Sequence, residues 1–238
     1  AQRACDYNFA NLFMWGPVYK ARIARLCGRL AVQVRYPAPH AYLWPVGSGD
    51  LQPALLALEA DAAEWDRPLH LAAVTEEQKA QLEDLFPGQF RYREERADFD
   101  YLYEIGRLAE LTGKKLHAKR NHVNRFLKEN PSWVYEELTP QNLSECLVMD
   151  EQWYLRSRDR EGLGEEQDLN DEGLALRRAM NHFTALGLEG GLLRVYGEVV
   201  AFTIGSALGG DTYDVHYEKA YGELQGAYAM INRCFARQ

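Results

Sequence analysis

The first half of the chain contains several short segments in which apolar and polar residues alternate with a period of two. This alternation runs through 19–28 and 29–37, and Gly28 between the two segments predicts a β-hairpin. The other strands expected in this half lie at 40–47, 68–74, 89–95 and 98–104. Strands closely spaced along the sequence predict a mostly antiparallel sheet.

Two further segments of the first half have helical periodicity and carry signals for a helix start. Asp50 stands before the apolar run 51–65, where an Asp side chain can accept from a free backbone N–H. Thr75 begins the run 75–86, and Gln78 three positions later completes the pattern of a capping box. Both segments are predicted to be helices that cover the sheet.

The second half repeats this mixture in a different order. The periodicity is helical from Ile105, and strand alternation returns after Pro131. Helices are expected at 140–156, starting at Pro140, and at 171–186, and strands at 132–138, 190–196, 198–208 and 211–220. The charged connection 157–171 is expected to be mobile, and 220–236 is predicted to form a loop followed by a helix.

These elements predict an α/β (α+β) protein with two related halves, 1–104 and 105–238. Each half is expected to have a mostly antiparallel sheet flanked by helices. The last residues, CFARQ, belong to a segment of helical pattern, so the second half is expected to be C-terminally incomplete.

Composition narrows the range of functions. The chain has 27 Lys and Arg against 35 Asp and Glu, a formal net charge of -8, which excludes a general nucleic-acid coat. Four cysteines without a close pair fit a reducing compartment. Neither a run of about 20 apolar residues nor the apolar core of a signal peptide is found. We expect a cytoplasmic protein, either free or peripheral to the membrane.

The basic charge is concentrated in one segment. Six cations and no Asp or Glu lie between Lys114 and Lys128, so the balance outside this segment is 21 against 35, or -14. If 111–128 is helical, Lys115 and Lys119 share a polar face, while apolar residues pack inward. This segment is either a solvated helix face or a binding site for a ligand that carries phosphates.

The strand 211–220 offers the best candidates for a general base. Strict alternation places Thr212, Asp214, His216 and Glu218 on one face. Acyl transfer requires a group that removes the proton of the attacking amine or hydroxyl, and His216 or Glu218 can do so. The alternative is a buried polar row that neighbouring strands satisfy.

A loop with a single glycine follows this strand. The order of strand, Glu223-Leu224-Gln225-Gly226-Ala227 and helix resembles the GNAT acyltransferase superfamily, whose Q/R-x-x-G-x-G/A loop holds a pyrophosphate. The loop of this chain lacks the arginine and the second glycine. Its other interpretation is an ordinary turn between strand and helix.

Three segments carry a more specific resemblance: CDYNFANLFMW (5–15), FDYLYEIGRLAELTGKKLHAKRNHVNRF (99–126) and HYEKAYGELQGAYAMINRCF (216–235). They resemble the bacterial family grouped with the C-terminal domain of phosphatidylglycerol lysyltransferase, itself similar to the Fem aminoacyltransferases in having two GNAT-like halves. The resemblance implies transfer of an aminoacyl group from a charged tRNA to an amine or hydroxyl acceptor. The acceptor would be an anionic lipid head group, a peptide or a small amine.

The resemblance and the patterns together give two sets of binding candidates. Residues expected to bind the phosphates of the donor are Lys115, Lys119, Arg120, Asn121, Arg125, Lys219, Gln225, Gly226 and Tyr228. Trp153 and Tyr154 are candidates for an acceptor pocket, although aromatic residues on an amphipathic helix also fit a core position.

Two other functions stay open at this point. One is an acyl-CoA-dependent N-acyltransferase, and the other is a noncatalytic GNAT-like protein that binds a nucleotide or an anion. A metal site is not expected, because His117 and His122 are five positions apart and no cysteine pair supplements them. No bound cofactor is expected besides the donor. Neither a GxSxG elbow nor a GxxxxGK[ST] loop occurs, which argues against a serine hydrolase or a P-loop enzyme.

Overall fold

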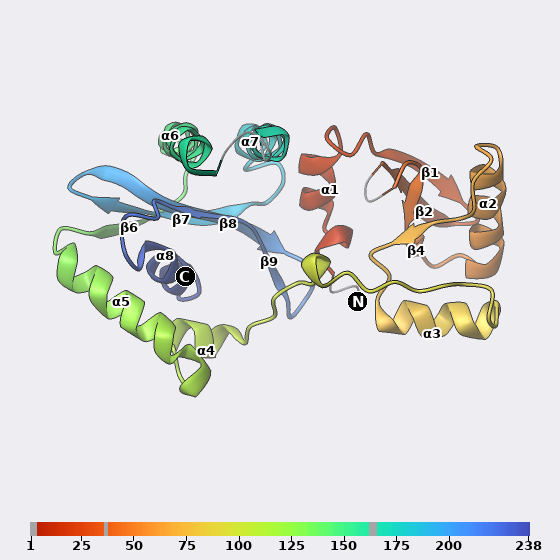
Figure 1. The fold of residues 1–238 in the computed structure, drawn as a ribbon, viewed down its shortest axis with the longest axis horizontal. Coiled ribbons are helices and arrows are strands. Elements are labelled where there is room, and N and C mark those ends of the chain that lie inside the picture. Colours follow the sequence, from red (N-terminus) through yellow and green to blue (C-terminus); the bar gives the residue numbers. More distant parts are fainter. Residues whose placement is uncertain (1–3, 36–37, 162–165) are drawn as a thin grey trace. The chain divides into compact units, whose positions relative to one another are not determined.

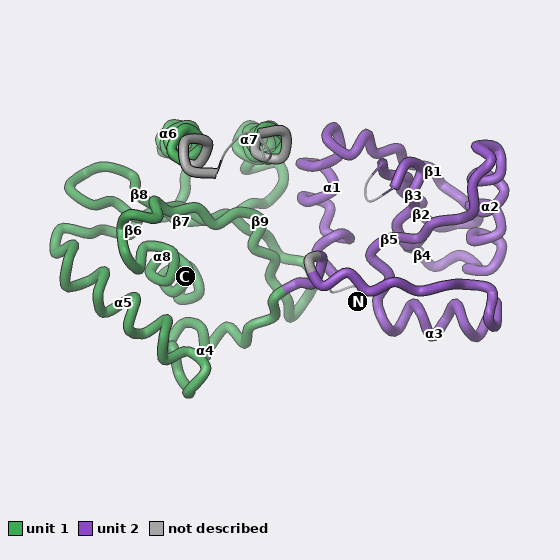
Figure 2. The backbone as a smooth tube through the Cα atoms, in the orientation of Figure 1, with its two compact units in different colours: residues 1, 101–238 green, residues 2–100 purple. Residues whose placement is uncertain are grey.

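The computed structural model describes residues 4–35, 38–161 and 166–238, and its backbone forms two compact units (Figures 1 and 2). The N-terminal unit extends to Asp100, and the C-terminal unit comprises Tyr101–Gln238. Both are mixed α/β structures in which a mostly antiparallel sheet is flanked by helices, so the predicted fold class is confirmed.

The N-terminal unit is built on a sheet with the strand order β1-β2-β3-β5, in which β4 also pairs with β2. All of its pairs are antiparallel except β3 with β5. Its strands are β1 (Arg22–Leu26), β2 (Arg29–Val34), β3 (Ala41–Leu43), β4 (Val46–Gly47) and β5 (Leu71–Ala72). Cys27 and Gly28 both have positive φ, as the tight turn of a two-residue hairpin requires, so the predicted hairpin is confirmed.

The helices of this unit are α1 (Phe9–Trp15), α2 (Leu51–Ala63) and α3 (Glu76–Leu85), with 3-10 turns at Cys5–Tyr7 and Arg96–Asp98. The predicted caps are present. The Asp50 side chain accepts from the backbone N–H of Gln52, and Thr75 forms a complete capping box with Gln78. Trp44, Leu55 and Leu82 form part of the core that α2 and α3 bury with the sheet.

The two strands predicted at 89–95 and 98–104 are wrong. Both segments are described, and neither pairs with a strand there. Phe90 instead packs against the core around Trp44, while most side chains of 91–95 are exposed. The alternating residues therefore belong to an extended segment that Phe90 anchors to the core. No neighbouring strand pairs with this segment.

The C-terminal unit has an antiparallel sheet in the order β6-β7-β8-β9, with helices on both faces (Figure 1). Its strands are β6 (Val134–Glu137), β7 (Glu189–Val195), β8 (Glu198–Ala207) and β9 (Tyr213–Ala220). One face carries α6 (Leu143–Glu161) and α7 (Glu166–Asn181). The other carries α4 (Ile105–Glu110), α5 (His117–Glu129) and α8 (Ala227–Phe235), with a 3-10 turn at Lys114–Leu116.

Most of the connection predicted at 157–171 is helical instead. Helix α6 continues to Glu161 and α7 begins at Glu166, while 162–165 lie outside the described residues. The stretch contains charged or polar residues that favour a helix, namely Arg158, Arg160, Glu161, Glu166 and Gln167. A dense charge pattern was therefore a poor indicator of a loop here.

A β-bulge in β9 changes which side chains share a face. Tyr217 lies opposite Ile204 and Val215 opposite Gly205, so the residue between them, His216, has no partner in the ladder. Alternation is interrupted at this point. The prediction of a single polar face is wrong, because Glu218 contacts α8 whereas His216 contacts Ser206, which lies on the face of α6 and α7.

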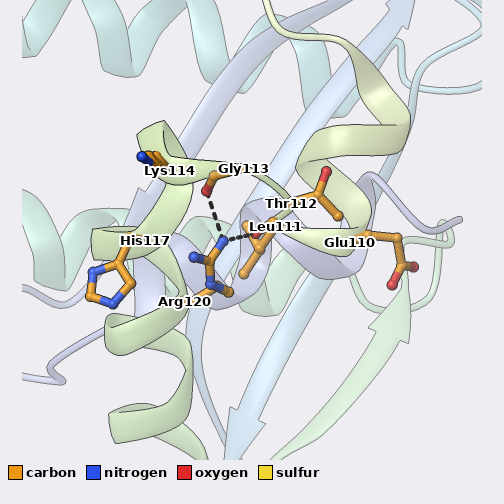
Figure 3. Close-up of a pocket in the computed structure, with 7 residues that line it drawn as sticks. All are labelled: Glu110, Leu111, Thr112, Gly113, Lys114, His117 and Arg120. Carbon is orange, nitrogen blue, oxygen red and sulfur yellow. Dashed lines mark hydrogen bonds between the residues drawn. The ribbon is translucent and has the colours of Figure 1, made fainter.

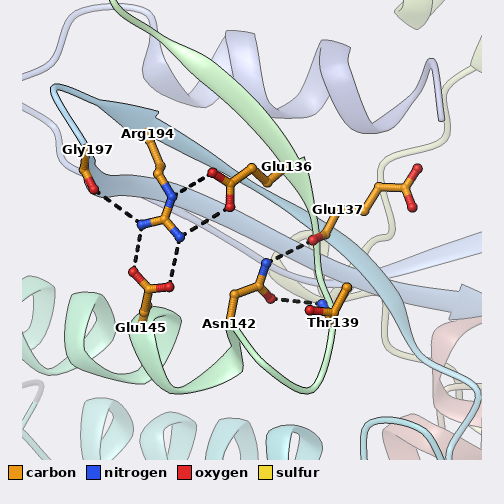
Figure 4. A network of polar contacts seen from close by, with 7 residues as sticks. All are labelled: Glu136, Glu137, Thr139, Asn142, Glu145, Arg194 and Gly197. Atoms are coloured by element: carbon orange, nitrogen blue, oxygen red, sulfur yellow. Dashed lines mark hydrogen bonds and ion pairs between the residues drawn. The ribbon is translucent and has the colours of Figure 1, made fainter.

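A cluster of polar contacts anchors the start of α6 to the sheet (Figure 4). The Arg194 guanidinium bridges Glu136 of β6, at 2.8 Å from Nε, and Glu145 of α6, at 2.6 Å from Nη1. These hydrogen bonds raise the pKa of Arg194 and lower that of Glu145. Asn142, just before α6, accepts from the Thr139 backbone N–H at 2.8 Å. The helix therefore begins three residues later than Pro140, where its start was expected.

Candidate functional site

A buried lysine connects the sheet of the C-terminal unit to the two helices above it. Lys219 lies in β9, and its Nζ is 2.8 Å from Asp150 Oδ1 of α6 and 2.9 Å from Glu172 Oε2 of α7. The same ammonium lies 4.1 Å from the centre of the Trp153 ring, a cation–π contact. We call these four residues the Lys219 cluster.

The Lys219 cluster has one formal positive charge and two formal negative charges. Lys219 and Asp150 are buried, whereas 29% of the Glu172 side chain is exposed, so the cluster reaches solvent at Glu172. Buried charges are tolerated only when they are paired and hydrogen-bonded. The excess of one carboxylate suits the cluster to a further cation or hydrogen-bond donor that arrives from solvent.

The end of β9 and the loop after it are attached to α6 by a second group of contacts. The Tyr221 hydroxyl donates to Gln152 Oε1 at 2.8 Å, and the Arg156 guanidinium stacks 4.0 Å from the centre of the Tyr221 ring. Arg156 also forms an ion pair with Glu223. Burial raises the pKa of Tyr221, although Arg156 opposes this shift. The start of the loop that contains Gly226 is thereby attached to α6 through Tyr221 and Glu223.

His216 lies between a hydroxyl and a carboxylate on the face of α6 and α7. Its Nε2 is 2.9 Å from Ser206 Oγ, and its Nδ1 is 3.4 Å from Asp214 Oδ2. Burial lowers the pKa of His216 to about 4. The imidazole is therefore neutral at pH 7 and can accept a proton, although its side chain is almost completely enclosed.

Replacing His216 with Asn should remove a pH dependence of stability. The folded-state pKa near 4 lies below the unfolded value of about 6.5, so the unfolded chain binds the proton first as the pH falls. This contribution is fully present above about pH 6.5 and is lost as the pH falls towards 4. The advantage of wild type over His216→Asn in urea unfolding should shrink by about 3 kcal/mol between pH 7 and pH 4.

The matched control is His70→Asn, the same substitution at an exposed histidine. An advantage of His216 that stays constant with pH would contradict a buried neutral imidazole.

Glu218 is held on the opposite face of the sheet. Its Oε2 accepts from Asn232 Nδ2 of α8 at 2.7 Å. Burial raises the pKa of Glu218, and the hydrogen bond from Asn232 and the charge of Lys119 oppose this rise. The two predicted bases, His216 and Glu218, therefore lie in different environments on different sides of the sheet.

Two cations of the basic segment bind their own chain. Helix α5 begins at His117, later than the expected start at Leu111, because Leu111 and Gly113 both have positive φ. The Arg120 guanidinium donates to the backbone carbonyls of Leu111 and Gly113, the second at 2.9 Å. Lys119 is partly buried and lies 5.5 Å from the centre of the Tyr103 ring.

This corner between α4 and α5 borders an open pocket of about 660 Å³ (Figure 3). Its walls are formed by the turn Leu111–Lys114 together with Glu110, His117 and Arg120. Arg120 stands in the centre of Figure 3, directed at the turn it holds. The pocket is thus basic on one side, although part of that basic charge stabilises the turn.

Gly226 marks a close approach of α8 to α5. It has φ +88, and a Cβ at this position would clash with the His122 carbonyl oxygen. Glycine is therefore required by the backbone and by helix packing at this position. Gln225 and Tyr228 on either side are exposed, next to the N-terminus of α8.

Comparison with known proteins assigns this chain to a family. The sequence model described as "Phosphatidylglycerol lysyltransferase, C-terminal" matches residues 1–238, the whole chain. The chain belongs to this family. Membership in the phosphatidylglycerol lysyltransferase C-terminal family makes it a member of a transferase family and confirms the resemblance seen in the sequence.

The solved structures similar to this family member include the following two. A conserved protein of unknown function from Bacteroides thetaiotaomicron VPI-5482 is 39% identical, with a TM-score of 0.90, over 99% of this chain and 78% of the other. The C-terminal domain (DUF2156) of a putative lysylphosphatidylglycerol synthetase from Agrobacterium fabrum is 13% identical, with a TM-score of 0.56, over 94% of this chain and 67% of the other. The second likeness concerns the fold alone. Among curated proteins, none matches this chain.

The structure brings together two of the predicted binding residues of this family member, Trp153 and Lys219. The other predicted residues lie apart from them. Tyr154 is 3.5 Å from Asn170 of α7, and Arg125 pairs with Glu129 at 2.8 Å. Lys115 and Asn121 are exposed at the start and in the middle of the basic segment. Their proposed contacts with phosphates stay predictions.

Sequence reasoning missed the partners of Lys219. Asp150 and Glu172 come from two helices, and only the spacing of Asp150 and Trp153, three positions apart on one helix, hinted that they share a face. Gln152 and Arg156 have the same signal at four positions apart.

The described residues meet the requirements of neither a metal site nor a membrane span. Among them, no group of three or more His, Cys, Asp or Glu side chains is arranged to hold a metal. None of their helices has both the length and the hydropathy of a membrane-spanning segment.

Proposed function

We propose that the C-terminal unit transfers an aminoacyl group from a charged tRNA to an amine or hydroxyl acceptor, with the Lys219 cluster as its reaction centre. The observation that carries this proposal is the excess of one carboxylate around a buried ammonium, next to the face of Trp153. An aminoacyl ester carries an α-ammonium group. Asp150, Glu172 and the Trp153 ring are the groups that such a cation prefers.

The reaction needs three contributions from the chain. Lys219 would stabilise the negative charge that develops on the carbonyl oxygen when the acceptor attacks the ester. The partly exposed Glu172 would accept the proton that the attacking amine or hydroxyl loses. The bond to the 3′ oxygen of the tRNA then breaks, and this oxygen takes up a proton as the tRNA leaves. No covalent intermediate with the protein is part of this proposal.

His216 and Glu218 are the alternative proton acceptors. His216 is favoured by its neutral imidazole on the same face as Lys219, and Glu218 by its raised pKa. Glu172 is favoured for direct contact with a substrate, because the His216 side chain is almost completely enclosed and the Glu218 carboxylate is buried against Asn232. Comparing Glu172→Gln, His216→Asn and Glu218→Gln separates the three, since only the true base should lower kcat with little change in KM.

Donor phosphates would lie at the exposed N-terminus of α8 and on the neighbouring polar face of α5. Gln225 and Tyr228 flank Gly226 there, and Asn121 and Arg125 of α5 are exposed. Backbone N–H groups at a helix start favour an anion. Acyl-CoA remains the second donor class, because the same loop precedes a helix in GNAT acyltransferases.

The experiment is transfer of a labelled amino acid from charged tRNA, with phosphatidylglycerol, peptides and small amines as acceptors. Wild type should form product, and Glu172→Gln should slow turnover on the order of a hundredfold. Tyr196→Ala is the control, because Tyr196 is exposed in the turn between β7 and β8. This substitution should leave the rate unchanged. Absence of both transfer and tRNA binding would overturn the proposal. A thermal shift with CoA but none with tRNA would favour the acyl-CoA alternative, and saturable binding without turnover would favour a noncatalytic protein.

A further inference from the structure

Strand β1 forms an open edge of the sheet in the N-terminal unit. Among the described residues, only β2 pairs with it. Leu26 and Arg29 flank the two-residue turn between these strands, and such a pair exchanges both of its backbone hydrogen bonds. The N–H and C=O groups of Arg25 and, by alternation, of Ile23 are therefore directed away from β2. This edge offers backbone donors and acceptors to a further strand.

The side chains of β1 leave the edge accessible. Residues 22–25 are all exposed, so neither face of the strand is covered there. Ile23 is 75% exposed, and Leu30, its diagonal neighbour on β2, is 41% exposed on the same face. Proteins usually cover or shorten an edge strand, because an open edge can pair with another chain. An exposed edge that also carries a large apolar side chain is typical of a binding surface.

The edge is basic as well as open. Between Asp6 and Asp50 the chain contains no Asp or Glu. The cations of this stretch are Lys20, Arg22, Arg25, Arg29 and Arg35. Arg29 donates to the backbone carbonyls of Gly49 and Pro45. The other four are exposed, and no ion pair joins them to an acidic side chain in the described part of the chain.

Two acidic side chains near this hairpin have partners of their own. Asp61 of α2 accepts from the Tyr42 hydroxyl and from Gln33 Nε2, the second at 3.3 Å, and Gln33 lies opposite Arg22. Asp50 accepts from the first turn of α2 and caps that helix. The positive charge of the β1 edge is therefore available to a partner.

We propose that β1 binds an extended acidic segment of another protein, which adds a strand to the sheet. Backbone hydrogen bonds to Ile23 and Arg25 would fix the register of this segment. Its carboxylates would pair with Arg22 and Arg25, and an apolar side chain between them would cover Ile23.

Charge and backbone geometry favour this occupant over a second copy of the chain or a nucleic acid. Two copies paired antiparallel about Ala24 would bring the Arg22 and Arg25 side chains of both copies into one small sheet, and like charges there repel. A nucleic acid would use the arginines, but it would leave the outward carbonyls without donors and Ile23 in water. An acidic strand satisfies the carbonyls, the cations and the apolar side chain together.

Binding of such a segment goes beyond the proposed transfer reaction and does not depend on it. The edge lies in the N-terminal unit, whereas the Lys219 cluster lies in the C-terminal unit. The measurement below needs no donor and no turnover. Its failure and the failure of the transfer assay are therefore separate results.

The test is fluorescence polarisation of a labelled peptide in which Glu and Val alternate, with the full chain as the binding protein. The peptide should bind saturably, and at least tenfold more tightly than the same peptide with Lys in place of Glu. Arg22→Glu with Arg25→Glu should weaken binding about tenfold, because carboxylates then face carboxylates. Ile23→Pro should weaken it to a similar extent, since proline removes an outward N–H and leaves the ladder with β2 intact.

Hydrogen exchange distinguishes strand addition from attraction by charge alone. The outward amides of Ile23 and Arg25 should exchange several-fold more slowly when the Glu-Val peptide is bound. Attraction between charges without backbone pairing would leave both rates unchanged and would overturn the proposal.

Arg67→Glu with Arg91→Glu is the matched control, because it makes the same change of charge at exposed arginines of the same unit. It should bind the peptide as wild type does. Equal binding of the Glu and Lys peptides, or wild-type binding by Arg22→Glu with Arg25→Glu, would contradict an acidic strand at this edge. So would a single-stranded RNA oligonucleotide that binds through the same arginines while the peptide does not, which would assign the edge to nucleic acid.

Discussion

Replacing Lys219 with Met should lower the free energy of unfolding by about 3 kcal/mol. Methionine is similar in length and fills the space, but it leaves Asp150 without the cation that stands 2.8 Å away. An unpaired buried carboxylate is costly, whereas the partly exposed Glu172 can turn to solvent. Urea unfolding at pH 7, followed by circular dichroism, measures the difference.

Second substitutions separate charge from packing in this prediction. Lys219→Met combined with Asp150→Asn should recover part of the lost stability, because the buried negative charge is removed along with its partner. Lys115→Met, at an exposed lysine, should be nearly neutral. If Lys219→Met were as mild as Lys115→Met, the Lys219 cluster would contribute nothing to folding.

Replacing Gly226 with Ala should cost about 3 kcal/mol or more, which combines backbone strain with overpacking. The new methyl group would meet the His122 carbonyl oxygen and, next, Phe126. Both belong to α5, so the substitution should force α5 and α8 apart. Thermal unfolding measures the loss, and hydrogen exchange of α8 amides shows whether the helix is displaced.

Gly197→Ala isolates the contribution of strain. Gly197 has φ +86, close to the value at Gly226, but nothing lies within 4 Å of the position that its Cβ would occupy. It should therefore lose only about 1 kcal/mol. Equal losses of stability at the two glycines would show that α5 and α8 can move apart at little cost in free energy.

The sequence predicted an element well where the contacts that stabilise it are close together in the chain. Asp50 and Thr75 cap their helices by hydrogen bonds within three residues, and both caps are present. The segment 89–104 is different, because a strand exists only if a neighbour pairs with it. Alternating residues there satisfied the pattern, but no partner strand among the described residues reaches them.

The Lys219 cluster shows the same limit for the site. Resemblance to a family pointed to Lys219, and the aromatic pattern pointed to Trp153, but nothing in the sequence related them to each other. Their contact depends on how α6 packs over β9. Periodicity indicates that a residue faces the sheet, but it does not indicate which strand residue it meets.

Counting cations in a sequence also overestimates how many can bind a ligand. Lys119 and Arg120 looked like two free charges of a basic helix. In the structure the Arg120 guanidinium donates to a backbone carbonyl of the turn before α5, and the Lys119 ammonium stacks on the Tyr103 ring. The accessible basic charge therefore lies at the ends of the segment, at Lys114 and Lys115 and at Lys128.

The bulge at His216 also determines where β9 can change length. Val215 and Tyr217 pair with adjacent residues of β8, so removing the residue between them would close the ladder without moving any other pair. A deletion at any other position of the strand would shift the pairing of one part against β8 and turn its side chains to the opposite face. Within β9, insertions and deletions of one residue among proteins with this sheet should therefore collect at this position.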